Sequence, residues 1–117
     1  MATQLKWVEA SDEYQIPFML AARKVFQGAP VLCPRCNDAT LRYYFHVFNQ
    51  SRRQGTVWAW CPKCHTHCHL PRVSPQNVKQ IDPFADLTLD QFAELELDPR
   101  EPLLSRLNRL WEEGKLA

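Results

Sequence analysis

The chain has 117 residues, of which 45% are hydrophobic and 23% charged, with a formal net charge of +1. This size and composition predict one soluble domain, too short for most enzyme scaffolds, and exclude a disordered chain or a membrane-spanning run of about 18 apolar residues. Charged residues interrupt the N-terminal segment, so we expect no secretory signal and a cytoplasmic protein whose five cysteines serve metal or redox chemistry rather than disulfides.

The first predicted element is a helix. Apolar residues recur at helical spacing from Ile16 to Gln27, and Gly28 follows as a stop signal. We expect this helix to pack against the core.

Two cysteine motifs of the same form come next along the chain. Cys33 and Cys36 are separated by Pro-Arg, and Cys61 and Cys64 by Pro-Lys. A two-residue gap lets neighbouring thiolates share one tetrahedral ion at about 2.3 Å each, and two such pairs fill all four positions of a structural zinc site. The sequence therefore predicts one structural Zn²⁺ held by these four cysteines.

The residues around the motifs bear on the alternatives to zinc. Asn37 and His65 follow the two motifs and tolerate positive φ better than most residues, as the turn around a metal requires. A redox dithiol needs only one cysteine pair, so the duplication argues against it. Iron accepts the same four thiolates, and spacing alone favours zinc without excluding iron.

A β-hairpin is predicted between the motifs. Residues 41–49 and 56–60 are rich in Tyr, Phe, Val and Trp, and a polar tip with Arg52 and Arg53 joins them. Residues 67–73 read as a third antiparallel strand, with Cys68 expected in the core. Both faces of this sheet carry large apolar side chains, so we expect the flanking helices to cover them.

Two helices are predicted after a connector over residues 71–83. Thr88 and Gln91 have the spacing of a capping box, and the second helix begins near Pro99 or Pro102 and ends at Gly114. Its apolar stripe is expected to face the core.

Charge is distributed unevenly along the chain. Residues 30–79 carry one acidic and seven basic residues, whereas residues 80–117 carry nine acidic and four basic ones. Within the second segment, carboxylates recur every four residues, and we call this set the acidic row: Asp86, Asp90, Glu94 and Asp98. Such a row on one helix places like charges side by side, which indicates a surface for a basic partner.

Residues 31–73 resemble a zinc ribbon, and the four cysteines fit the ligand positions of that fold one by one. The resemblance implies a structural metal and, because the fold serves many functions, little more. We therefore expect an α+β fold, in which a three-stranded antiparallel zinc-ribbon sheet is flanked by an N-terminal helix and two C-terminal helices. Residues 1–117 are expected to form one domain, with a helical segment over 1–29, the ribbon over 30–75 and acidic helices over 76–117.

A second resemblance concerns function. The strands at 41–49 and 55–62 and the closing helix at 103–114 are similar to small bacterial zinc-ribbon proteins, some of which resemble immunity proteins of polymorphic toxin systems. This resemblance implies a cytosolic antidote that blocks a toxin domain by direct contact. It assigns no inhibitory residue to this chain.

Three classes of function follow from these features. Catalysis is the weakest, because the sequence has no triad motif and no phosphate loop and the four-thiolate site has no open position, so we expect neither an enzyme nor a small-molecule substrate. Nucleic-acid binding through Arg52 and Arg53 is the alternative, although the acidic C-terminal third opposes it. The favoured hypothesis is a protein-binding module that presents the acidic row to its partner.

Overall fold

The computed structural model describes residues 7–26, 29–49, 54–73 and 82–116 of the chain. The elements form an α+β arrangement, in which three consecutive strands are followed by two helices. In chain order the elements are β1 (Val8–Glu9), α1 (Asp12–Phe26), β2 (Arg42–Asn49), β3 (Gln54–Trp60), β4 (Thr66–Val73), α2 (Leu89–Glu96) and α3 (Leu103–Glu112). The predicted N-terminal helix, hairpin, third strand and two C-terminal helices are all present.

The sheet differs from the predicted one. In the described part of the chain it has four strands in the order β1-β4-β3-β2, with β2, β3 and β4 antiparallel and β1 parallel to β4. The expectation of a three-stranded, purely antiparallel sheet is therefore wrong. β1 has only two residues, too few to show the alternation of apolar and polar residues that marks a strand. Backbone hydrogen bonds connect residues 8–10 to β4 and the residue before it: Val8 N donates to His65 O and Ala10 N to His67 O, each at 2.9 Å.

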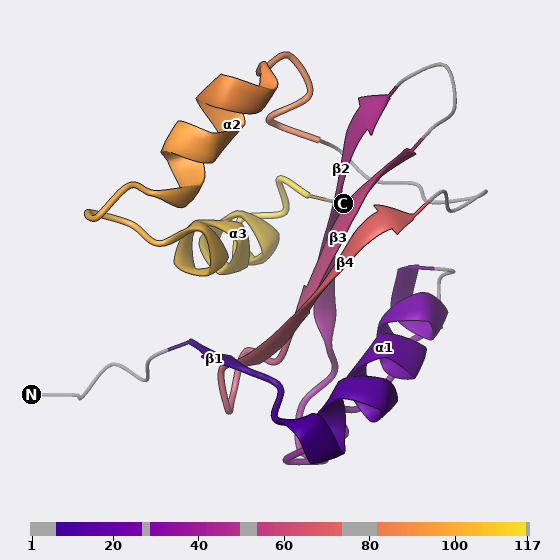
Figure 1. Cartoon of the computed structure of the whole chain (residues 1–117). Helices are drawn as coiled ribbons and strands as arrows, with labels where there is room; N and C mark the ends of the chain where they lie inside the picture. Colours follow the sequence, from indigo (N-terminus) through magenta and orange to yellow (C-terminus); the bar gives the residue numbers. More distant parts are fainter. Residues whose placement is uncertain (1–6, 27–28, 50–53, 74–81, 117) are drawn as a thin grey trace, which may run out of the picture.

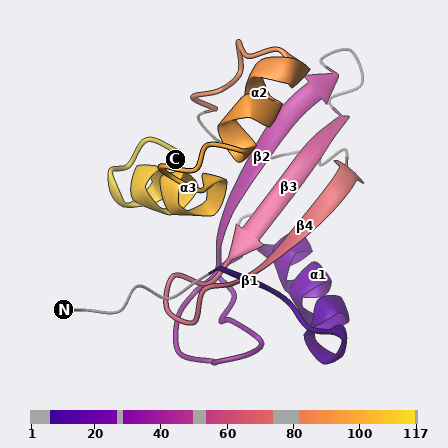
Figure 2. The same cartoon turned by 60° about the vertical axis from the view of Figure 1, so that its left-hand side comes forward.

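Helices cover both faces of the sheet (Figures 1 and 2). On one face, α2 and α3 pack over Tyr44, Trp58 and Trp60. On the other face, Ala22 of α1 packs over Phe45 among other residues of the strands. Because both faces of β2 and β3 are apolar, the sheet needs a layer on each side, as the sequence predicts.

α1 begins at Asp12, ahead of the predicted start at Ile16. The Ser11 carbonyl accepts hydrogen bonds from the amides of Tyr14 and Gln15, and Asp12 lies in the first turn, where negative charge is favourable. Pro17 lies inside the helix and removes one amide donor from it. The apolar periodicity starts after this polar first turn, which explains the difference.

The ends of the C-terminal helices follow their predicted signals. Thr88 caps α2 and forms a capping box with Gln91, in which each side chain accepts from the other residue's amide. α3 follows Pro102, and after its end Gly114 has a positive φ of 73°. The amides of Gly114 and Lys115 donate to Trp111 O and Leu110 O, which closes the helix in a Schellman motif.

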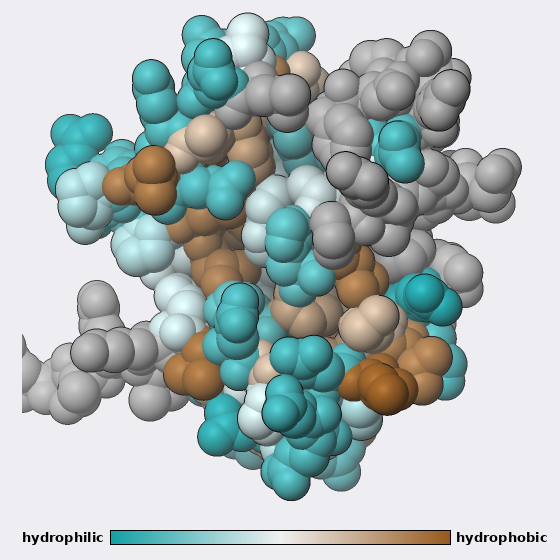
Figure 3. Space-filling model, viewed as in Figure 1, coloured by the Kyte–Doolittle hydropathy of each residue, from teal (hydrophilic) through white to brown (hydrophobic). Residues whose placement is uncertain are grey.

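Few large apolar side chains are exposed. Leu97, just after α2, is 80% exposed, the largest fraction for a bulky apolar residue in the described ranges. Figure 3 shows hydrophobic side chains at the surface where α2 leads into α3, among hydrophilic neighbours.

Candidate metal centre

The four predicted ligands come together at one end of the sheet. The Sγ atoms of Cys33, Cys36, Cys61 and Cys64 all lie within 4.8 Å of one another. Two of the Sγ–Sγ distances are 3.7 Å, from Cys33 to Cys64, and 3.6 Å, from Cys36 to Cys61. A tetrahedral ion with four bonds of about 2.3 Å requires sulfur atoms about 3.8 Å apart, so the cluster fits a metal ion, plausibly zinc.

Each cysteine pair lies in a tight turn. The amides of Asn37 and His65 donate to Cys33 O and Cys61 O at 2.9 and 3.1 Å, and both residues have positive φ, 52° and 58°. The predicted backbone of the two turns is therefore confirmed. The first turn precedes β2 and the second joins β3 to β4, so the hairpin brings together residues that are distant along the chain.

Burial makes two of the four thiols, those of Cys33 and Cys61, reluctant to ionise. It raises the pKa of Cys33, and it raises that of Cys61 to about 12. Burial also raises the pKa of Cys64, but hydrogen bonds to Thr66 and to neighbouring thiols outweigh it and lower that pKa to about 7. Four thiolates in so small a space need a cation to balance them, which is the role a bound Zn²⁺ would have.

Thr66 links the two turns beside the sulfur atoms. Its buried hydroxyl accepts from Arg35 Nη1 at 2.8 Å and lies 3.3 Å from Cys64 Sγ. Arg35 belongs to the first turn and Cys64 to the second. The hydroxyl can therefore donate to the Cys64 thiolate while Arg35 fixes its orientation, an interaction that the sequence alone did not indicate.

The fifth cysteine lies apart from the cluster. In the described part of the chain, the four cysteines named above are the only group of cysteine, histidine or acidic residues close enough to share a metal. Cys68 packs instead with the apolar residues on the α1 side of the sheet, and burial raises its pKa to about 12. This placement agrees with its expected role as a core residue.

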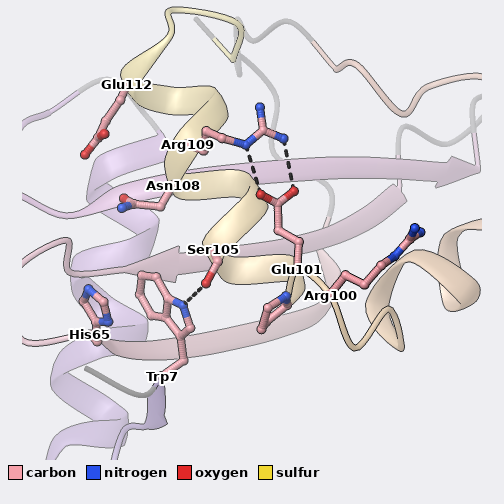
Figure 4. A pocket seen from close by; sticks show the side chains of 9 residues that line it. Trp7, His65, Arg100, Glu101, Ser105, Asn108, Arg109 and Glu112 are labelled. Atoms are coloured by element: carbon pink, nitrogen blue, oxygen red, sulfur yellow. Dashed lines mark hydrogen bonds and ion pairs between the residues drawn. The ribbon is translucent and has the colours of Figure 1, made fainter. Parts of the chain in front are cut away.

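A groove of about 390 Å³ lies between the second turn and α3 (Figure 4). On one wall the Trp7 indole stacks on His65, with ring centroids 4.0 Å apart, and Trp7 Nε1 donates to Ser105 Oγ at 2.8 Å. On another, Arg109 binds Glu101 through two hydrogen bonds of 3.0 and 3.1 Å. The contacts of Trp7 connect the second cysteine turn to α3. The charge of Arg109 is paired with that of Glu101.

A second polar cluster lies under α2. The Tyr44 hydroxyl donates to Asp82, and His46 Nδ1 lies 2.9 Å from that hydroxyl and 3.2 Å from Asp82 Oδ2. Burial, and then the Asp82 charge, raise the pKa of Tyr44, so its phenol remains protonated. His46 also stacks on Phe92 at 4.2 Å. This network fixes the start of the C-terminal segment to β2. No local sequence motif predicts these contacts.

The acidic row does not lie on one continuous helix. Asp90 and Glu94 belong to α2, whereas Asp86 precedes it and Asp98 follows it. Asp98 is bound by Arg100 and Arg106, each at 3.3 Å. Asp86, Asp90 and Glu94 are exposed and have no ion pair with any described residue. The alternative nucleic-acid contacts Arg52 and Arg53 lie outside the described residues.

Comparisons with known proteins identify no relative of this chain. The chain matches no protein-family model, no curated protein and no solved structure. None of the helices in the described ranges is both long and apolar enough to cross a membrane. What the chain offers is thus a four-cysteine cluster that could hold a metal, within an α+β fold.

Proposed function

We propose that this protein is a zinc-stabilised, non-catalytic module of the cytoplasm that binds another protein. The observation that carries the proposal is the acidic surface on and before α2, formed by Asp86, Asp90 and Glu94, which have no ion pair with any residue that the structure describes. Several other carboxylates of the C-terminal segment, such as Glu101 and Glu113, are bound by arginines of the same chain. Exposed carboxylates without such partners are free to meet an external cation.

The metal has a structural part in this proposal. Four cysteine ligands fill the tetrahedral positions of zinc, so the ion would have no site for water or substrate. It would instead fix the ends of β2, β3 and β4, and α2 and α3 pack on β2 and β3. A rigid sheet then holds the acidic surface in one orientation for its partner.

The partner that fits is a protein with a basic surface. Complementary charge raises the rate of encounter and disfavours wrong partners. A toxin domain that handles nucleic acid has such a surface, and inhibition of one by direct contact is the form of this function suggested by the sequence resemblance. Asp98 would act within the chain, since Arg100 and Arg106 already bind it.

The metal half of the proposal is tested by replacing single cysteines. We expect one zinc per wild-type chain, and we expect Cys36→Ser and Cys64→Ser to lose the zinc and unfold the sheet, because metal binding and folding share one free energy. Cys68→Ser is the matched control and should keep its zinc. Elemental analysis of folded, iron-free protein with less than about half a zinc per chain would contradict the proposal.

The binding half is tested by capture from a lysate of cells that make the protein, after nuclease treatment. Wild-type protein should retain one partner, and Asp90→Lys with Glu94→Lys should lose it while keeping the fold, because exposed substitutions usually cost no more than about 0.5 kcal/mol. Loss of all captured material on nuclease treatment, with RNA or DNA recovered beforehand, would instead favour the nucleic-acid alternative. Unaltered capture by the charge-reversed variant would remove the acidic surface from recognition.

A further inference from the structure

An apolar groove runs beside the acidic surface of α2. It has a volume of about 570 Å³ and lies along α2 and the connection from α2 to α3. Its apolar lining is formed by Leu87, Leu95, Leu97 and Pro99. Leu97 is 80% exposed although its amide is fixed to Ala93 O at 3.2 Å, so the backbone holds this side chain at the surface.

The charges at the rim of the groove have one sign on the α2 side. Glu94 lines the groove, and Asp90 lies one turn earlier on the same helix, about 6 Å away along the axis. Neither has an ion pair with a described residue. Arg100 also lines the groove, where it binds Asp98 at 3.3 Å, a carboxylate that Arg106 binds as well. The groove therefore combines an apolar lining with a rim that is negative on the α2 side.

We propose that this groove docks a cationic amphipathic segment of the partner protein. An apolar side chain of the segment lies against Leu97, and lysine or arginine side chains one helical turn apart meet Asp90 and Glu94. This inference rests on the proposed function, because it names the part of the partner that the acidic surface receives. It adds an apolar contact that charge alone does not require.

A second copy of this chain is a poorer occupant than another protein. It would have to offer free cations one helical turn apart. Among the described residues, Arg23 and Lys24 of α1 are exposed without an ion pair, but they are adjacent in the sequence rather than four residues apart as Asp90 and Glu94 are. The cations around the cysteine turns and the sheet are engaged within the chain. Arg42 binds Glu112 at 3.1 Å, Lys63 binds Asp38, and Arg35 donates to Thr66. A foreign basic segment has no such competing pairs.

The test uses the full zinc-loaded chain and a fluorescent, amidated helical peptide of leucine and lysine, with lysines four residues apart. Leu97→Gln removes the apolar contact and keeps the charge, whereas Asp90→Asn with Glu94→Gln does the reverse. Ile16→Gln and Asp12→Asn with Glu13→Gln are the matched controls on α1, where Ile16 is 68% exposed. Fluorescence anisotropy gives the Kd at low and at physiological salt.

We expect Leu97→Gln to weaken binding about tenfold at both salt concentrations, since apolar burial is not screened. The α2 charge variant should weaken it mainly at low salt, and the α1 controls should bind as wild type does. If only the charge variant weakens binding, the groove inference fails while the proposed function stands. If neither α2 variant differs from its control, both fail. A reversible dimer in sedimentation equilibrium that Leu97→Gln abolishes would overturn the foreign segment in favour of a second copy.

Discussion

Thr66 lies between Arg35 and the cysteine cluster and contacts both. Its hydroxyl is buried, accepts from Arg35 and lies 3.3 Å from Cys64 Sγ. A metal ligand that receives such a hydrogen bond is held in orientation and has its negative charge spread. We therefore expect the affinity for a bound Zn²⁺ to depend on a side chain that does not itself bind the ion.

We predict that Thr66→Val keeps the strand and one zinc per chain but weakens zinc binding by roughly tenfold, because loss of a ligand's hydrogen-bond partner typically has that effect. Competition with a chromophoric zinc chelator measures the change. Thr40→Val, at an exposed position, is the control. An unaltered zinc affinity in Thr66→Val would show that the hydroxyl serves packing alone.

His67 gives the fold a pH dependence. Its Nδ1 is buried and has no hydrogen-bond partner among the described residues. Burial lowers the pKa of His67; Glu9, opposite it on β1, opposes this shift and His69 adds to it, while burial also lowers the pKa of His69. The folded state thus favours neutral histidine, whereas the unfolded chain takes up protons near pH 6.5.

The sign of the effect follows from proton uptake. Because the unfolded state binds more protons below about pH 6.5, stability is complete above that pH and decreases as the pH falls. We predict that the midpoint of thermal unfolding is lower at pH 6.0 than at pH 7.5, and that His67→Gln with His69→Gln reduces this difference. Zinc content measured at both pH values separates this effect from metal loss. An equal difference in the variant would assign the pH dependence to other groups.

Among the described side chains of α2, one chiefly attaches the helix to the sheet. Phe92 is its buried anchor, 5% exposed, and it stacks on His46 at 4.2 Å and contacts Trp58 at 5.5 Å between ring centroids. The exposed face of the same helix carries Asp90 and Glu94. The aromatic contact on one face therefore positions the acidic surface on the other.

We predict that Phe92→Ala lowers the free energy of unfolding by about 3–5 kcal/mol or releases α2 from the sheet at a smaller cost. Hydrogen exchange should show faster exchange in the α2 amides than in those of β3. Leu97→Ala, which removes an exposed side chain, is the control and should change neither quantity. Equal protection of α2 in Phe92→Ala and wild type would show that other contacts hold the helix.

The elements that the sequence predicts are those with a strong local signal. The capping box at Thr88 and the stop at Gly114 are encoded within a few residues, and the structure confirms both. The sequence does not indicate β1, because this strand consists of two residues and pairs through its backbone. It predicts a late start for α1 because the first turn of the helix is polar.

The candidate metal site also combines residues that the sequence predicts with contacts that it does not. The four cysteines are recognisable from their spacing, which reflects the geometry of a single ion. Their surroundings depend on residues distant along the chain: Arg35 and Thr66 are 31 positions apart, and Trp7 and Ser105 are 98. The same holds for the polar cluster under α2, where Tyr44 and Asp82 are 38 positions apart. Such pairs are decided by tertiary packing, so no sequence window contains both partners.

For the whole molecule, the two sides of the sheet depend on different parts of the chain. α1 covers one face, and the segment after Asp82 covers the other, where Tyr44 and Trp60 are fully buried. Asp82 itself is bonded to Tyr44 and His46. The segment after Asp82 therefore covers the aromatic face of the sheet and also carries the acidic surface.

Truncation after Asp82 tests whether residues 1–117 behave as one cooperative unit. Removing α2 and α3 exposes Tyr44, Trp58 and Trp60, and each large apolar side chain left in water costs on the order of 1.5–3 kcal/mol. Since single domains are stable by only about 5–15 kcal/mol, we predict that the truncated chain aggregates or is digested quickly by protease even with zinc present. Limited proteolysis and analytical ultracentrifugation, each beside the full chain with equal zinc, measure this. A truncated chain that is monomeric and as resistant as the full protein would mean that the cysteine cluster and α1 stabilise the sheet alone, with α2 and α3 forming an appended module rather than part of the core.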